Sequence, residues 1–191
     1  MKKFALVLTV AALALMISSG AQAQGKMGAS VGLEVLLPLG TFGDAAKIGI
    51  GGTGQFDYML NPNIALTGKI GYITWGAKTG DTQGAVEASF SGIPILVGGK
   101  YYFQPAGKTR FYGQFELGFF IMSVSTKVNV PGFVSSDFSA SSTEFTVCPA
   151  VGVEIPAGPK GAVDISARFW GILSSGGSSN IGLRAGYKFL F

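Results

Sequence analysis

Apolar and polar side chains alternate along most of the chain, and this period of two restricts the fold more than any other feature. In residues 181–191, Tyr187, Phe189 and Phe191 fall on one face and Lys188 falls on the other. That spacing is typical of a β-strand, in which successive side chains point to opposite sides. We therefore expect an all-β fold whose strands have one apolar and one polar face.

Eight segments alternate in this way, and turn-forming residues separate them. The segments are residues 28–37, 49–60, 64–72, 92–103, 110–121, 144–155, 163–173 and 181–191. The connections after the second, fourth and sixth segments are short, and the first connection, about 38–47, is compact. Mostly longer connections rich in Ser, Thr and Gly lie at about 76–90, 123–144 and 174–180. Short periplasmic turns and longer outer loops are typical of bacterial transmembrane barrels, so we expect both termini in the periplasm.

The first 23 residues have the three parts of a Sec signal peptide. Lys2 and Lys3 precede an apolar stretch, and Ala21-Gln22-Ala23 has the small-x-small form of a cleavage site. A membrane-spanning helix needs about 20 apolar residues, and this stretch is shorter. The cleavage point carries no cysteine, which argues against a lipoprotein anchor. We expect cleavage after Ala23, which leaves residues 24–191 as one barrel domain.

The rest of the chain has one way to cross a membrane. Cys148 is the only cysteine, so no internal disulfide can stabilise the exported protein. No later segment has the roughly 18 uninterrupted apolar residues of a transmembrane helix. The closed β-barrel is the other architecture that satisfies its backbone hydrogen bonds in lipid. The sequence therefore predicts an eight-stranded, antiparallel, up-and-down transmembrane β-barrel.

Ten charged side chains within the eight segments fall on the polar face. They are Glu34, Asp57, Lys69, Lys100, Glu116, Glu154, Asp164, Arg168, Arg184 and Lys188. A basic side chain that faces lipid at the bilayer midplane costs roughly 2–4 kcal/mol, so we expect the polar face to line the lumen. Acidic and basic residues alternate around the barrel, and pairing of opposite charges would offset the cost of removing them from water. We expect a lumenal charge network with a structural role.

The aromatic side chains on the apolar face distinguish a membrane barrel from a soluble one. A soluble barrel of the lipocalin type would show the same alternation with its apolar face inside. Several rings of this face lie at the predicted periplasmic ends of the strands, namely Tyr58, Tyr101, Phe103, Phe111, Tyr187, Phe189 and Phe191. A membrane interface selects such a belt of rings at one level. We therefore expect a periplasmic-side aromatic girdle on a lipid-facing outer surface.

The signal sequence, the eight alternating segments and the terminal "GYKFLF" resemble the small eight-stranded outer-membrane β-barrel family, which includes OmpX, OmpW and the membrane domain of OmpA. The resemblance implies a multi-pass protein in the outer membrane of a Gram-negative cell, in contact with the lipid bilayer and lipopolysaccharide. It also implies handling by periplasmic chaperones and by the outer-membrane assembly machinery, which reads a C-terminal strand that ends in Phe. That assembly signal would fall on Tyr187, Phe189 and Phe191.

Two prolines depart from the expected strand pattern. Pro94 and Pro149 lie inside the fourth and sixth segments, where a closed barrel has no free edge to accept a residue without an N–H group. We expect a local bulge at each of them.

The residue types needed for catalysis are scarce. The chain has no histidine, the usual base that activates a serine nucleophile. Glu116 and Glu154 are a candidate acid–base pair, but lumenal ion pairing explains them better. Cys148 has no predicted base beside it, and Gly49–Gly54 ("GIGGTG") lacks the Lys-Ser/Thr of a phosphate-binding loop. We expect no enzymatic activity, no cofactor and no metal site, and the near-neutral charge gives no footprint for nucleic acid.

The sequence favours a structural or surface-interaction role, because ten charged side chains would fill the lumen of an eight-stranded barrel. Residues 123–144 continue to alternate and turn at Pro131-Gly132. They predict either a hairpin that projects from the cell and offers an adhesive edge to an extracellular partner, or a mobile loop.

The alternative is a narrow channel or a lateral-exit conduit for small hydrophobic molecules, as in OmpW. Such a conduit needs an apolar upper lumen. The candidate lining residues on the inward face are Trp75, Phe120, Met122, Trp170 and Ile172.

Overall fold

The computed structural model describes residues 27–78, 86–103, 109–128, 136–173 and 178–191, and the predicted signal peptide lies outside them. The strands are β1 (Met27–Leu39), β2 (Ala46–Asn61), β3 (Ile64–Ala77), β4 (Val86–Tyr102), β5 (Arg110–Val128), β6 (Ser136–Pro156), β7 (Gly161–Leu173) and β8 (Ser178–Leu190). A short helix, α2 (Gly40–Ala45), joins β1 to β2. Within the described ranges, no helix is long and apolar enough to cross a membrane.

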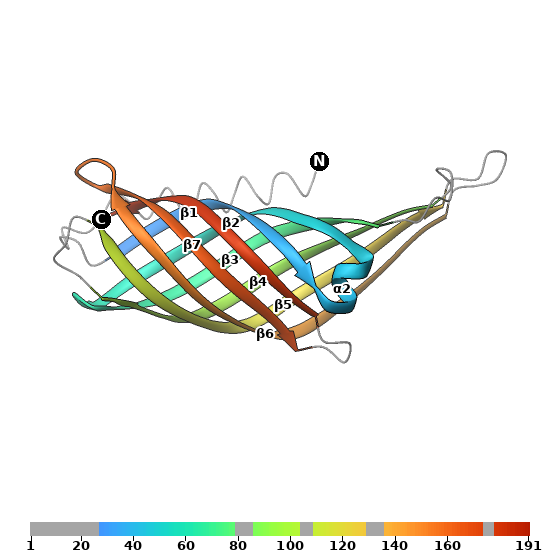
Figure 1. The fold of residues 1–191 in the computed structure, drawn as a ribbon, viewed down its shortest axis with the longest axis horizontal. Coiled ribbons are helices and arrows are strands. Elements are labelled where there is room, and N and C mark those ends of the chain that lie inside the picture. The colour runs from blue at the N-terminus through green and yellow to red at the C-terminus, as the bar shows by residue number, and fades with distance from the viewer. Residues whose placement is uncertain (1–26, 79–85, 104–108, 129–135, 174–177) are drawn as a thin grey trace.

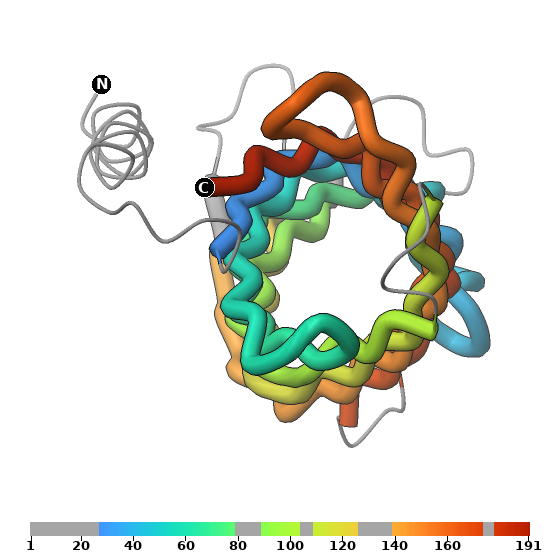
Figure 2. The backbone as a smooth tube through the Cα atoms, turned by 90° about the vertical axis from the view of Figure 1, so that its left-hand side faces the viewer, coloured from blue at the N-terminus to red at the C-terminus, as the bar shows by residue number. Residues whose placement is uncertain are grey.

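The strands form a closed barrel in which each one pairs antiparallel with its neighbours in the chain, and β8 pairs with β1 (Figure 1). The view from one end shows the complete ring (Figure 2). At the seam, Glu34 lies opposite Arg184 and Ser30 lies opposite Lys188. The backbones of Met27 and Phe191 exchange hydrogen bonds of 3.2 and 3.0 Å. The aromatic end of the chain is thus ordered because it completes the ladder, and the predicted fold class is confirmed.

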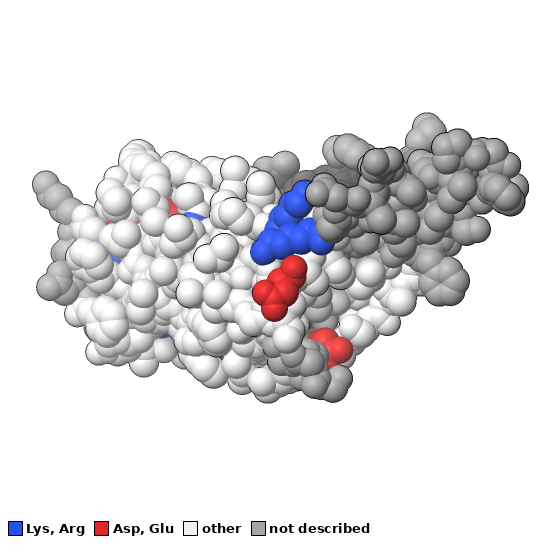
Figure 3. Space-filling model, turned by 45° about the vertical axis from the view of Figure 1, so that its right-hand side comes forward, with Lys and Arg blue, Asp and Glu red and all other residues white. Residues whose placement is uncertain are grey.

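The polarity of the two faces is the reverse of that in a soluble protein. Large apolar side chains such as Leu33 and Leu183 are 70% and 62% exposed on the outer surface. The alternate positions point inwards, and Glu34 and Arg184 there are at most 1% exposed. In the space-filling view, the visible surface has few charged atoms apart from blue and red groups near the middle of the view and a red group below them (Figure 3).

Three strands are longer than the alternation alone predicted. β4 begins at Val86 rather than near Gly92, so the connection expected at 76–90 is shorter. The ladder between β5 and β6 runs to the pair Val128 and Ser136, so the strands of a hairpin are present, while Pro131-Gly132 lies outside the described residues. β7 ends opposite Phe145, and beyond that point the described part of β6 pairs with β5 only. A sheet of β4, β5 and β6 therefore extends beyond the rest of the barrel, on the right in Figure 1.

The bulges expected at Pro94 and Pro149 are absent, and that prediction was wrong. The β4–β5 register is unbroken at Pro94, and the β5–β6 register is unbroken at Pro149. Pairing is interrupted only on the opposite side of each proline, towards β3 and β7, and it resumes there in the same register. In an antiparallel strand each N–H group faces one neighbour, so a missing donor disturbs only one ladder. Register shifts occur instead between β2 and β3, at Ala46/Gly49 and Met59/Asn61.

Candidate functional site in the barrel interior

The basal cluster, Asp57, Lys100, Glu154 and Lys188, fills the interior near the short turns. Each of these side chains is at most 2% exposed. Glu154 is its centre, because its Oε1 accepts hydrogen bonds from Lys100 Nζ at 3.0 Å and from Lys188 Nζ at 2.9 Å. Lys188 Nζ also lies 2.5 Å from Asp57 Oδ2. Two lysines and two carboxylates are therefore paired with one another inside the barrel.

Tyr102 and Arg110 complete the basal cluster, although the alternation alone did not single them out. Tyr102 donates its hydroxyl to Glu154 Oε1 at 2.8 Å, and Arg110 Nη2 lies 2.6 Å from Glu154 Oε2. Tyr102 follows Lys100 at the spacing of two, so the inward period could have indicated it.

The central cluster, Glu34, Lys69, Glu116, Arg168 and Arg184, lies further along the lumen. Glu116 Oε2 is 2.5 Å from Lys69 Nζ and 3.1 Å from Arg168 Nη1. Glu34 Oε1 is 3.8 Å from the Nε atoms of Arg168 and Arg184. All five side chains are buried, so three cations and two carboxylates lie together inside the barrel.

Asp164 joins the two clusters. Its Oδ1 is 3.0 Å from Arg184 Nη1 in the central cluster, and its Oδ2 is 3.6 Å from Lys100 Nζ in the basal cluster. All ten charged residues that the sequence places on the inward face are therefore buried and connected by ion pairs. A continuous network of this kind occupies the lumen and holds strands from the whole circumference together.

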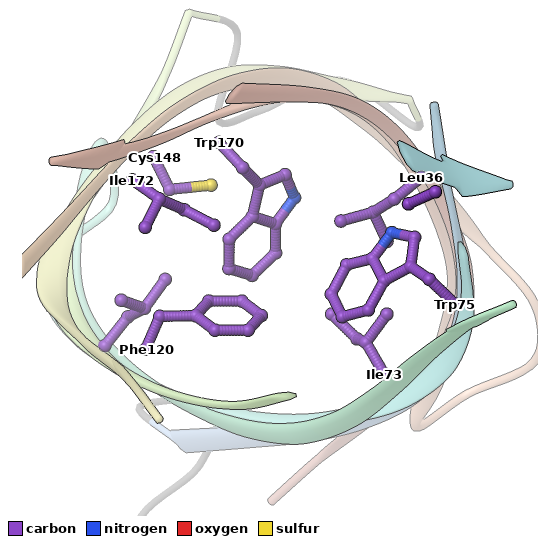
Figure 4. Packing of buried hydrophobic residues seen from close by; sticks show 9 residues of the cluster. Leu36, Ile73, Trp75, Phe120, Cys148, Trp170 and Ile172 are labelled. Atoms are coloured by element: carbon purple, nitrogen blue, oxygen red, sulfur yellow. The ribbon is translucent and has the colours of Figure 1, made fainter. Parts of the chain in front are cut away.

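An apolar plug fills the interior beyond the central cluster. Its buried members are Leu36, Ala46, Ile73, Trp75, Leu96, Phe120, Cys148, Trp170 and Ile172. Phe120 packs between the two indoles, with ring centroids 6.0 Å from Trp75 and 5.8 Å from Trp170 (Figure 4). Met122 packs against the plug but is only partly buried. The five residues proposed as an apolar upper lumen are thus brought together.

Glycines opposite the interior rings were not recognised from the sequence. A side chain at Gly49 would overlap the indole of Trp75, and one at Gly92 would overlap the ring of Phe120. Gly152 makes the same kind of space for Tyr112. The strand register decides these pairings, and a single sequence does not give the register.

The seven residues of the predicted girdle lie near one end of the barrel. The first six, from Tyr58 to Phe189, are exposed on the outer surface, and Phe191 is half-buried. Tyr101 packs edge-on against Phe103, and Tyr187 packs edge-on against Phe189. Exposed rings also occur elsewhere on the outer surface, for example Phe119 and Phe169, so the aromatic residues are not confined to one level.

The side chains that the sequence offered as candidates for catalysis are engaged by other groups in the structure. Glu116 and Glu154 are each held by two or more cationic groups, and Cys148 is fully buried in the plug. No group of three His, Cys, Asp or Glu side chains that could hold a metal ion occurs in the part of the chain that the structure describes.

A closed barrel with an apolar exterior and buried ion pairs in its interior is an integral membrane β-barrel of the outer-membrane class. The family model of the outer membrane protein beta-barrel domain matches residues 5–189, so the chain belongs to this family. The predicted location in the outer membrane is thereby confirmed.

Solved structures of outer-membrane proteins share the fold. Neisserial surface protein A (NspA) matches with a TM-score of 0.58 and 15% identity over 86% of this chain and 97% of that chain. Ail, the attachment invasion locus protein of Yersinia pestis, matches with a TM-score of 0.55 and 15% identity over 87% and 99%. OprG from Pseudomonas aeruginosa matches with a TM-score of 0.60 and 10% identity over 88% and 96%. Identities this low show the fold alone, and the search of curated proteins found no match.

Proposed function

We propose that this protein is a surface-interaction barrel, in which a sealed transmembrane part anchors an extended β4–β5–β6 sheet outside the cell. The observation that carries the proposal is the open edge of β6. Ser139 to Thr143 are exposed, and among the described residues this stretch pairs with β5 alone. Unpaired strand edges accept extended peptides by adding a strand, which gives adhesion a backbone-based mechanism.

The filled interior supports the anchoring role. Ten paired charges and the apolar plug occupy the lumen. An eight-stranded barrel is just wide enough for its own side chains to fill it, so these side chains leave no evident pore. Ail, which is named as an attachment invasion locus protein, has the same fold. We propose no enzymatic reaction for this barrel.

The proposed adhesion is tested by shortening the extended sheet while the barrel is kept. Residues 124–140 are replaced by a two-residue Asn-Gly turn, and cells that display either form are compared for binding to extracellular-matrix proteins and host cells. We expect the shortened form to reach the surface and to lose binding. Equal binding by both forms would refute the role of the β6 edge.

A protein anchored in the outer membrane must be delivered there and inserted, so the proposed role also requires partners during biogenesis. We propose that Tyr187, Phe189 and Phe191 form the signal read by the assembly machinery, after periplasmic chaperones deliver the unfolded chain. The support is that Phe191 also pairs with Met27, so this strand completes the barrel.

A second candidate is a conduit for small hydrophobic molecules, and the apolar plug favours it. Planar-bilayer conductance and dye uptake into liposomes test it on one purified sample. The ion-pair network predicts silence in both assays, and a reproducible conductance step or uptake above empty liposomes would favour the conduit.

A further inference from the structure

The outward face of β4, β5 and β6 changes from apolar to hydroxylated at one level. The outward residues Ile95, Phe119 and Phe145 lie in one row across the three strands, and all three are exposed. Four residues further towards the outer end of each strand, two successive rows consist of serines. They are Ser91, Ser123 and Ser141, followed by Ser89, Ser125 and Ser139, and each is exposed or half-buried. The lipid-facing surface therefore ends here, and a surface of hydroxyl groups continues above it.

This hydroxylated face continues sideways onto β3 and β2, where two lysines join it. Thr74 on β3 is exposed and lies opposite Ser91. The side chain of Lys47 on β2 lies against Gly76, because a Cβ at Gly76 would be 3.6 Å from Lys47 Cδ. Lys78 follows Gly76 at the spacing of two, so it belongs to the same outward face. One continuous surface thus carries hydroxyl groups and two ammonium groups.

The two lysines are available to an anion. Both are exposed, and neither forms an ion pair among the described residues. The Lys78 ammonium donates a hydrogen bond of 2.6 Å to the Gly43 carbonyl of α2, which positions it and leaves two N–H groups. Asp44, the next residue of α2, is exposed but pairs with neither lysine in the described ranges. Neighbouring like charges repel each other, so an anion bound to both lysines is favoured.

The order of these surfaces along the barrel specifies the chemistry of the partner. The apolar rows suit acyl chains, and the lysines just above them suit phosphate groups. The hydroxyl groups beside the lysines suit the donors and acceptors of a sugar. Because the three surfaces are continuous, a molecule that has all three parts in this order can contact them at once.

We propose that this outer face of β2 to β6 binds a phosphorylated glycolipid of the outer leaflet, the class of molecule that includes lipopolysaccharide. A phosphate group lies between Lys47 and Lys78, the saccharide lies on the serine rows, and the acyl chains lie along Ile95 and Phe119. The site uses the face of the extended sheet and leaves the open edge of β6 free. The inference is therefore independent of the proposed adhesion.

Native mass spectrometry of the purified barrel in detergent measures the binding, with diphosphoryl lipid A as the probe. Lipid A without its phosphates is one control, and phosphatidylglycerol, an anionic lipid without a sugar, is the other. We expect saturable binding of lipid A. Dephosphorylated lipid A is expected to bind roughly 20-fold more weakly, because each lysine near an anionic headgroup contributes about a factor of five. Phosphatidylglycerol is expected to bind about tenfold more weakly, because it makes fewer hydrogen bonds.

Lysine variants test the phosphate position. Lys47→Gln and Lys78→Gln are each expected to weaken lipid A binding about fivefold. Lys160→Gln is the matched control, because Lys160 is also exposed but lies in the turn between β6 and β7, at the other end of the barrel. It is expected to leave lipid A binding unchanged.

Serine variants test the saccharide position. Ser91→Ala combined with Ser123→Ala is expected to weaken binding of lipid A and to leave binding of phosphatidylglycerol unchanged. Ser179→Ala is the control, since Ser179 is a half-buried serine on β8, which pairs with β7 and β1 and is not part of this face. The shift in gel mobility on heating verifies that each variant is folded.

Three results would overturn the proposal. Equal lipid A affinity of the three lysine variants would refute the phosphate site, and equal affinity for lipid A and phosphatidylglycerol would refute recognition of the sugar. Heparin, a soluble sulfated saccharide, tests an extracellular glycan as the occupant. Tighter binding of heparin than of lipid A, lost in the Lys47→Gln and Lys78→Gln variants, would assign the lysines to that glycan. Weakened lipid A binding with unchanged cell adhesion would support the glycolipid site and separate it from the β6 edge.

Discussion

At the residue scale, a few carboxylates in the interior each form ion pairs with several cations. Glu154 binds Lys100, Arg110 and Lys188, which come from three different strands. Removal of one partner from a buried ion pair is costly because it leaves the others uncompensated. Substitution of one of these carboxylates is therefore expected to destabilise the barrel more than substitution of an unpaired residue.

Glu154→Gln is expected to lower the free energy of unfolding by about 3–5 kcal/mol, because two buried lysines and the partly buried Arg110 lose a charge partner. Urea unfolding of the protein refolded into lipid vesicles, followed by tryptophan fluorescence, measures the loss. Glu144→Gln is the control, since Glu144 is partly exposed and has no ion pair among the described residues. Equal stability of the two variants would show that the network contributes nothing.

The glycines opposite interior rings give a second prediction at this scale. Gly49→Val would force a side chain into the indole of Trp75 and is expected to destabilise the barrel by about 1–3 kcal/mol. Gly68→Val is the control, because a Cβ at Gly68 has no neighbour within 4 Å. Unfolding midpoints in the same vesicles compare them, and a similar loss at both positions would contradict the packing argument.

At the level of the element, alternation predicted what each strand presents to each side but not how far it continues. For residues 139–143 the sequence left a hairpin strand and a loop equally open, because both faces are exposed and Ala140 is their one apolar residue. The bulge prediction failed at Pro94 and Pro149 for another reason. The prediction assumed that a proline disturbs the pairing with both neighbouring strands. The missing N–H group removes a hydrogen bond to one neighbour only, and the pairing with the other neighbour is unbroken.

The open edge of β6 should be visible in amide hydrogen exchange. Between Ser139 and Glu144, every second amide faces no strand among the described residues and is expected to exchange rapidly, while amides from Phe145 to Glu154 are protected by β5 or β7. Residue-resolved exchange by NMR in detergent micelles measures this difference. Uniform protection across Ser139–Glu154 would mean that the edge is covered.

At the scale of the whole molecule, the most predictable property was which face of the strands points into the barrel and which faces outwards. The ten charged positions that alternation placed inside are all buried, because the cost of exposing these groups to lipid fixes which face of each strand points inwards. The partners within the interior were not predictable in the same way. Contacts such as Arg184 with Asp164 depend on strand tilt and register, which the chain as a whole determines.

The central claim is that the apolar face contacts lipid while the charged face is sealed inside. Nitroxide spin labels at Val31, Phe115 and Leu183, in protein reconstituted into lipid bilayers, test this claim directly. The account predicts relaxation by dissolved oxygen and little relaxation by the water-soluble nickel complex Ni-EDDA at all three positions. Strong relaxation by Ni-EDDA at these outward positions would contradict it.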